Sequence, residues 1–322
     1  MRRLDLLIDD IRNATENDNP TSGSGIIDND IIRLLNKAQR RLFSIITSVN
    51  PEMFFAFQNI DTVVGTETYT LNTNAYLGGR VIMVEWLAGD TDDYVKLEPK
   101  TIHSRWTNDN GTPLWYMRTG NTLYINPRPS EAKTNGLRVT YQKRPRALDI
   151  RRGYVTTATI AAGLLTSLTL TNPSTLDTRD ADLDTAAGDI LKETDFICVV
   201  DKDGASVLDT ITVKDYNTST RVLTMKGSGF ATTLAAATIQ NNYIVAGKYA
   251  TDTCELPDDI EEYLLTYVEL FLLTRDGNSS EAKLKSQELV AIEADIKTAF
   301  ANDDLDIFIT PIDECMSGDG EY

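Results

Sequence analysis

The spacing of apolar residues changes twice along the chain, and this limits the fold more than any other feature of the sequence. Near both ends, apolar residues recur every three or four positions, as on one side of an α-helix. Between residues 66 and 249, short runs alternate apolar and polar residues, as half-buried β-strands do. Helices on either side of a long block of strands are typical of an α+β protein, and this is the fold class that we expect.

Two helices are expected before the strands. The first lies within residues 2–16 and ends before the turn-forming stretch Asn17-Asp18-Asn19-Pro20. The second begins at Asp28, a suitable N-cap residue, and ends before Pro51. Its apolar side is formed by Ile31, Leu34, Leu35, Ala38, Leu42, Ile45, Ile46 and Val49.

Two more helices are expected after the strands. The sequence Leu256-Pro257-Asp258-Asp259 suits the start of the first, which ends at Gly277. A long helix capped by Ser279 or Ser280 follows, and the short connection predicts an antiparallel helical hairpin. We therefore expect residues 1–65 and 250–301 to form one helical bundle.

Residues 66–152 are expected to form an antiparallel β region. Gly120-Asn121 lies between two apolar runs and is typical of a two-residue hairpin. The predicted strands are Tyr69–Leu71, Val81–Leu87, Tyr94–Leu97, Leu114–Met117, Leu123–Ile125 and Leu137–Tyr141.

Residues 153–249 form a second β-rich block, in which Asp203-Gly204 marks another hairpin. A small barrel or sandwich is the expected arrangement. The predicted strands are Leu164–Leu170, Phe196–Val200, Val207–Val213, Arg221–Met225 and Tyr243–Val245.

Charge is distributed unevenly along the chain, whose formal net charge is -17. Residues 100–152 carry 11 Lys or Arg and 3 Asp or Glu, whereas residues 250–322 carry 4 and 19. An anionic surface repels DNA phosphates, so we do not expect the chain alone to read or package DNA. The negative charge suits a wall past which a duplex slides, or simply a soluble surface.

The basic residues near the end of the first β region form a candidate interface. An acidic protein surface, such as another copy of this chain, is the favoured partner; an ordinary solvated face and a nucleic-acid contact are the alternatives. The candidates are Arg138, Lys143, Arg144, Arg146, Arg151 and Arg152.

Residues 302–322 read as an extended C-terminal arm. They carry seven acidic residues and no basic one. Apolar residues in such a tail have no core of their own to join, so we expect the arm to become ordered on a partner. The apolar candidates for this contact are Leu305, Ile307, Phe308, Ile309 and Ile312.

No catalytic, metal or cofactor site is expected. His103 is the single histidine, which excludes poly-His metal sites, and one imidazole without partners supports no catalytic mechanism. The three cysteines Cys198, Cys254 and Cys315 lie far apart and form no CxxC pair. The longest apolar stretch is too short to cross a bilayer, and the acidic N-terminal segment is unlike a signal peptide.

Four stretches of the sequence resemble the head-to-tail adaptors of tailed bacteriophages, also called connector or head-completion proteins. The pattern runs from Gly-x-Pro before an aromatic strand, through x-Pro-x-Pro and a Tyr-x-x-x-Pro strand, to Leu-Pro before helices. The stretches are residues 30–42 (DIIRLLNKAQRRL), 111–129 (GTPLWYMRTGNTLYINPRP), 137–145 (LRVTYQKRP) and 256–265 (LPDDIEEYLL).

The resemblance implies a structural virion protein with no enzymatic activity and no cofactor. Its copies would form a ring, typically of twelve, between the portal protein and the tail nozzle or tube proteins, with double-stranded DNA only in transit. The location would be the virion neck, after assembly in the host cytoplasm, with no membrane contact. In shorter adaptors, the strand that corresponds to residues 137–145 is followed almost directly by the helix that corresponds to residues 256–265. Residues 153–249 therefore read as an inserted domain.

One function from another class stays open. The β-rich block and the scattered aromatic residues also suit a carbohydrate-binding or adhesin-like module of a tail or baseplate. Annular particles would favour the adaptor, whereas a clear hit on a glycan array would favour this alternative.

Overall fold

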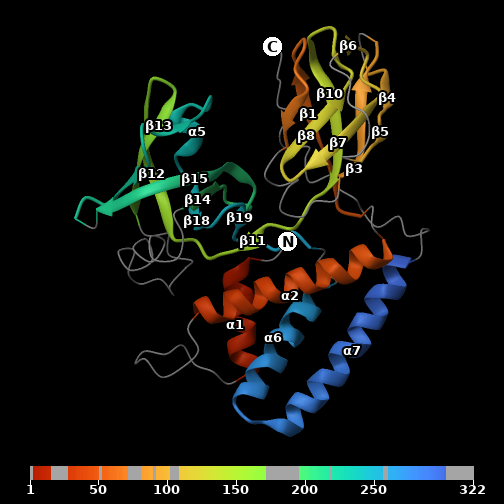
Figure 1. Ribbon diagram of the computed structural model, residues 1–322. Coiled ribbons are helices and arrows are strands. Elements are labelled where there is room, and N and C mark those ends of the chain that lie inside the picture. Colours follow the sequence, from red (N-terminus) through yellow and green to blue (C-terminus); the bar gives the residue numbers. More distant parts are fainter. Residues whose placement is uncertain are drawn as a thin grey trace. The chain divides into compact units, whose positions relative to one another are not determined.

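The computed structural model describes residues 3–15, 28–50, 53–71, 81–89, 92–101, 109–171, 196–217, 219–256 and 260–301 (Figure 1). They belong to two compact units. Unit 1 contains the described residues of Met1–Leu42 and Pro145–Ile296, and unit 2 contains those of Phe43–Arg144 and Lys297–Tyr322. Each unit is described by itself below.

The expected α+β class is confirmed. The four predicted helices are present, and the second begins at Asp28, as its N-cap signal indicates. A single turn of helix, α5, was not predicted. The helices of the described residues are α1 (Leu4–Ala14), α2 (Asp28–Val49), α5 (Ala236–Ile239), α6 (Glu261–Arg275) and α7 (Ser279–Ala301).

The helices of unit 1 contact one another through apolar and charged side chains. Helix α1 packs on α6 with four of its five large apolar residues fully buried, whereas Leu6 is exposed. Glu293 of α7 receives two side chains: the Arg41 guanidinium at 2.7 Å and the Tyr263 hydroxyl at 3.2 Å. Lys285 of α7 pairs with Glu269 of α6 at 2.9 Å. These contacts connect α2, α6 and α7.

A closed β-barrel forms the rest of unit 1. Six antiparallel strands follow the order β12-β18-β14-β15-β16-β13, and the pairing of β12 with β13 closes them into a ring. The short strand β17 pairs with β13 outside this ring. The strands are β12 (Gly153–Ala161), β13 (Leu164–Thr171), β14 (Phe196–Val200), β15 (Ser206–Asn217), β16 (Val222–Met225), β17 (Phe230–Ala231) and β18 (Tyr243–Ala246).

The barrel is filled by alternate apolar residues of its strands. Leu168, Ile211 and Leu223 are fully buried in one cluster with Val199 and Ile244. The predicted hairpin at Asp203-Gly204 connects β14 to β15, and Gly204 has a φ of +84°. A parallel bridge between β11 (Ala147–Leu148) and β19 (Ala250–Thr251) joins the two chain segments at the base of the barrel.

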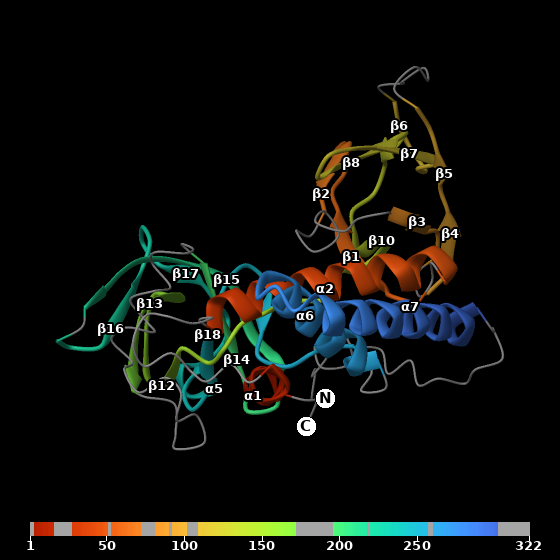
Figure 2. The same ribbon diagram turned by 90° about the horizontal axis from the view of Figure 1, so that it is seen from below.

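Unit 2 is built from two four-stranded sheets that share one core (Figure 2). The first has the order β1-β10-β3-β4 and is antiparallel throughout: β1 (Phe55–Thr62), β10 (Lys133–Gln142), β3 (Val81–Leu87) and β4 (Tyr94–Lys96). The second has the order β2-β8-β7-β5: β2 (Thr68–Thr70), β8 (Thr122–Asn126), β7 (Trp115–Thr119) and β5 (Glu98–Pro99). Strand β5 pairs parallel to β7, as does β6 (Asn110–Gly111) to β9 (Arg128–Pro129).

The hairpin predicted at Gly120-Asn121 is present in unit 2. Thr119 of β7 faces Thr122 of β8, so two residues form the loop. The φ of Gly120 is +60°, which fits a type II′ turn with glycine at its first central position. This turn fixes the register in which Tyr116 faces Ile125 inside the core.

Candidate interaction surface

The outer face of the β1-β10-β3-β4 sheet, here called the outer face, holds Arg138 between two aromatic rings. Side chains alternate along β10, so Val139 and Tyr141 are buried while Arg138 points outward. The guanidinium carbon of Arg138 lies 3.9 Å from the centre of the Tyr94 ring and 5.6 Å from that of Phe57. Both distances are within the range of cation–π attraction.

Charge on Arg138 is only partly compensated. Its Nη2 lies 3.6 Å from a carboxylate oxygen of Asp92, whose side chain is almost fully exposed. The Nε atom is buried without a hydrogen-bond acceptor among the described residues. The guanidinium is therefore held in place by the rings and remains able to bind a further acidic group.

Two phenylalanines of β1 extend the outer face to the edge of the sheet. Phe55 and Phe57 are 52% and 54% exposed, whereas Ala56 between them is buried. Large aromatic side chains at this level of exposure leave an apolar surface in contact with water, which is a common feature of protein interaction sites.

The basic residues after β10 continue the candidate interface within unit 2. The Lys143 N–H donates to the Phe54 carbonyl at 2.6 Å, which places Lys143 beside the start of β1. Arg144 follows and is exposed. The structure thus brings Arg138, Lys143 and Arg144 to one strand and the residues that follow it.

The other three candidates lie in unit 1, where each has acidic partners of the same chain. Arg146 makes two bonds to Asp209, at 2.8 and 2.9 Å, and contacts Glu255 at 3.2 Å. Burial alone lowers the pKa of Arg146, but the charges of Asp209 and Glu255 raise it overall. Arg146 therefore stays charged within an internal network.

Arg152 and Arg151 are more deeply buried than Arg146. Arg152 makes two bonds of 2.8 Å to Asp149, and both side chains are at most 7% exposed. Arg151 pairs with Asp252, stacks 3.9 Å from the centre of the Tyr243 ring, and donates to the Lys202 carbonyl at 2.8 Å. A role of these arginines in binding a partner stays a prediction.

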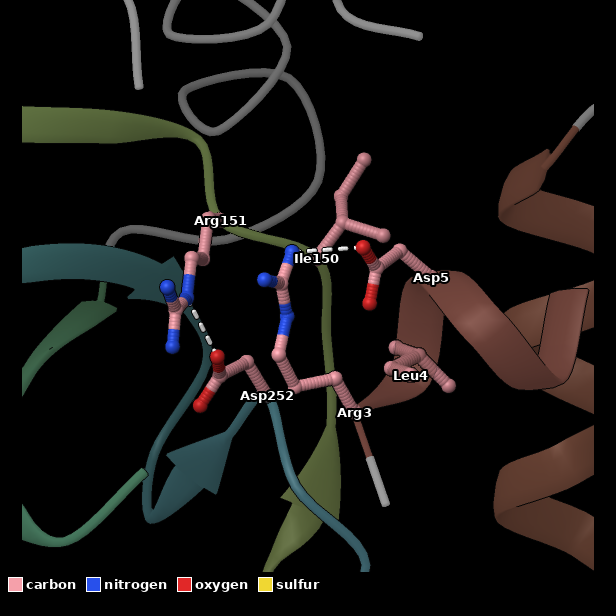
Figure 3. A pocket seen from close by; sticks show the side chains of 6 residues that line it. All are labelled: Arg3, Leu4, Asp5, Ile150, Arg151 and Asp252. Atoms are coloured by element: carbon pink, nitrogen blue, oxygen red, sulfur yellow. Dashed lines mark hydrogen bonds and ion pairs between the residues drawn. The ribbon is translucent and has the colours of Figure 1, made fainter. Parts of the chain in front are cut away.

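A small pocket lies where α1 meets the segment after β19 (Figure 3). The Leu4 N–H donates to the Asp252 carbonyl at 2.8 Å, and Arg3 donates to Asp5 at 2.5 Å. Burial raises the pKa of Asp252 against the opposing effect of Arg151. The charges of two arginines and two aspartates balance in this pocket. The contacts of Leu4 and Arg151 with Asp252 connect the start of α1 to the segment after β19 and to the barrel.

The described residues offer little reactive chemistry. Cys198 and Cys254 are buried and form no disulfide, and burial raises the pKa of Cys198 to about 11, which keeps it protonated near neutral pH. In the described ranges, no three His, Cys, Asp or Glu side chains gather as a metal site would need. His103, Cys315 and the five apolar arm candidates (Leu305, Ile307, Phe308, Ile309, Ile312) lie outside the described residues.

None of the helices in the described part of the chain combines the length and the apolar character that a bilayer span needs.

Comparison with known proteins identifies the family. The family model of the SU10 adaptor protein matches residues 2–168, which is more than half of the chain. No curated protein matches the sequence. The matched region includes helices α1 and α2, both sheets of unit 2 and three of the four stretches that carry the resemblance, residues 30–42, 111–129 and 137–145. The chain therefore belongs to the SU10 adaptor protein family, which confirms its resemblance to the head-to-tail adaptors of tailed bacteriophages.

Proposed function

We propose that this phage structural adaptor forms a ring that joins the capsid portal to the tail and lets the genome pass through its channel. The observation that carries this proposal is the family match, because it covers helices of unit 1 and the whole sandwich of unit 2. The ring would lie in the virion neck, after assembly in the host cytoplasm. A net charge of -17 supports a channel to which DNA does not adhere.

The proposed partners are the portal protein, the tail nozzle or tube proteins, and further copies of the chain, twelve in all. Contacts between α2, α6 and α7 support a helical bundle, which we assign to the portal side. The outer face with Arg138 supports a contact with an acidic surface. Residues 250–322 provide such acidity in every copy.

The barrel of residues 153–246 is proposed as an inserted lobe that meets tail proteins. Its closure through β12 and β13 supports a domain that can fold without help from the ring. The four-part division into bundle, first β region, insertion and arm stays a proposal, because the two compact units divide the chain differently.

Catalysis has no part in this proposal. The proposed function rests on shape and charge. The buried, protonated Cys198 and the ion pairs Arg3–Asp5 and Arg151–Asp252 of Figure 3 are consistent with a structural role.

Sedimentation of the purified chain with its portal protein tests the proposal. We expect the chain to migrate with the portal at low salt, and a tail protein to join only when both are present. A chain that stays monomeric with portal and tail proteins would overturn the proposal. A glycan array with the same sample separates the carbohydrate-binding alternative, because an adaptor ring predicts no hit.

A further inference from the structure

Strand β1 has one edge with no partner among the described strands. In the described sheet it pairs only with β10, and Figure 1 shows it at the margin. The Lys143 N–H donates to the Phe54 carbonyl, so residues 54 and 143 form a hydrogen-bonded pair. Such pairs alternate along an antiparallel ladder, so the backbone N–H and C=O groups of Phe55, Phe57 and Asn59 point away from β10. They provide a template for another strand.

This edge lacks the usual protection of edge strands. Exposed edges normally carry charges, prolines or bulges that prevent pairing. Residues 55–60 contain no charged residue and no proline, and the bulge comes only at the end, between Ile60 and Thr62. Phe55 and Phe57 add two half-exposed aromatic rings on the outer face. The edge and the rings together fit an extended apolar peptide.

The C-terminal arm contains such a peptide. Residues 305–310 read Leu-Asp-Ile-Phe-Ile-Thr and alternate three aliphatic residues with Asp306, Phe308 and Thr310. β-Branched and aromatic residues dominate this segment, as is typical of a strand, and Pro311 ends it.

Charge and length favour a match between the arm and the edge. The arm carries seven acidic residues and no basic one, whereas Arg138 and Lys143 lie beside β1. Only residues 302–304 separate α7 from the peptide. Because three residues leave little chain for turning back, this short connection favours a strand that runs on to the next copy.

We propose that residues 305–310 of one copy add as a strand to the open edge of β1 in a neighbouring copy. This inference rests on the proposed ring. Each copy gives one strand and receives one, which is the head-to-tail contact that closes a ring. The backbone hydrogen bonds supply affinity, while Phe55, Phe57 and Arg138 select an apolar and acidic peptide.

Photo-crosslinking between isotope-labelled copies tests the inference. Benzoylphenylalanine replaces Phe308 in the full chain, and heavy and light copies are mixed before assembly with the portal. We expect crosslinks from position 308 to residues 55–59 of a copy with the other label. Benzoylphenylalanine in place of Tyr322 is the control and should not select β1. Crosslinks within one copy, or from position 308 to other surfaces, overturn the inference.

A pair of matched variants makes the test specific. Phe57→Glu places a charge on the proposed edge, whereas Val95→Glu places one on β4, the opposite edge strand, at a residue of similar exposure, 51%. We expect the first to reduce the crosslink yield about tenfold and the second to leave it unchanged. Tryptophan fluorescence checks that both variants fold.

The two proposals fail in different ways. If the Phe57→Glu variant gives the same crosslink yield as the original chain, the strand addition is overturned, even when the portal complex forms normally. Failure of the original chain to bind the portal overturns the proposed function instead.

Discussion

Arg152 illustrates how buried charge contributes to this fold. Its guanidinium makes two bonds to Asp149, and Asp149 also accepts the Ala246 N–H at 2.6 Å. Replacing Arg152 with methionine keeps the volume but leaves the Asp149 carboxylate buried without its cation. We expect Arg152→Met to lower the free energy of unfolding by about 3–5 kcal/mol. Urea unfolding followed by far-UV circular dichroism measures the change.

Arg33 provides the control for this prediction. It forms an ion pair with Asp30 at 3.4 Å, and its side chain is 74% exposed. Arg33→Met should therefore cost less than about 1 kcal/mol. Equal effects of the two substitutions would contradict the structural role assigned to the buried pair.

Asp252 gives the fold a dependence on pH. Because burial raises its pKa, the folded protein holds the proton of this carboxyl more tightly than the unfolded chain does. Ionisation above about pH 4 therefore lowers the free energy of unfolding. Asp252→Asn removes this titration. The difference in unfolding free energy, original chain minus variant, should fall as the pH rises above about 4, measured by urea unfolding. A constant or rising difference would contradict the assignment.

At the scale of elements, Gly204 controls the hairpin between β14 and β15. A Cβ atom there would lie 2.0 Å from the Thr253 Oγ1 and 2.9 Å from its Cβ, so rotating Thr253 cannot relieve the clash. The φ of +84° adds strain for any other residue. We expect Gly204→Ala to lower the free energy of unfolding by about 2–4 kcal/mol, measured by circular dichroism.

Gly120 is the matched position for this test. Its φ is also positive, but an added Cβ meets nothing within 4 Å. Gly120→Ala should cost about 1–2 kcal/mol, the backbone strain alone. Trp86 and Trp115 belong to unit 2, so tryptophan fluorescence reports this variant. A cost for Gly120→Ala as large as that for Gly204→Ala would show that the clash contributes nothing.

Most elements could be predicted from the period of apolar residues. The bounds predicted for β3 and β14 agree with the structure at both ends, because their residues are nearly all apolar and most are β-branched or aromatic. Strand β1 was missed because its two phenylalanines lie on the exposed side, while small Ala56 and polar Gln58 alternate with them. Its pattern therefore differs from that of a half-buried strand.

The candidate surface was predictable only in part. Six basic residues close in sequence suggested one patch, but nothing local revealed the partners of Arg146 and Arg151. Their carboxylates lie 63 and 101 residues further along the chain, at Asp209 and Asp252. Likewise, the aromatic rings around Arg138 come from β1 and β4, which only the sheet order brings together.

For the whole molecule, the arm is expected to act in assembly rather than in folding. The few apolar residues of the arm, set among seven acidic ones, cannot form a core, so their burial must come from a partner. Deleting residues 302–322 should leave the melting temperature nearly unchanged and abolish stable docking to the portal. Calorimetry and sedimentation with the portal measure the two effects. Normal docking of the shortened chain would show that the arm has no such role.

The ring itself is the central claim. Cryo-electron microscopy of the complex between the portal and the full chain tests it most directly. The account predicts a map in which copies of this chain form a closed annulus beneath the portal, with an open channel on the shared axis that is wider than a DNA duplex. Single copies attached at scattered positions, or an assembly whose axis is blocked, would contradict it.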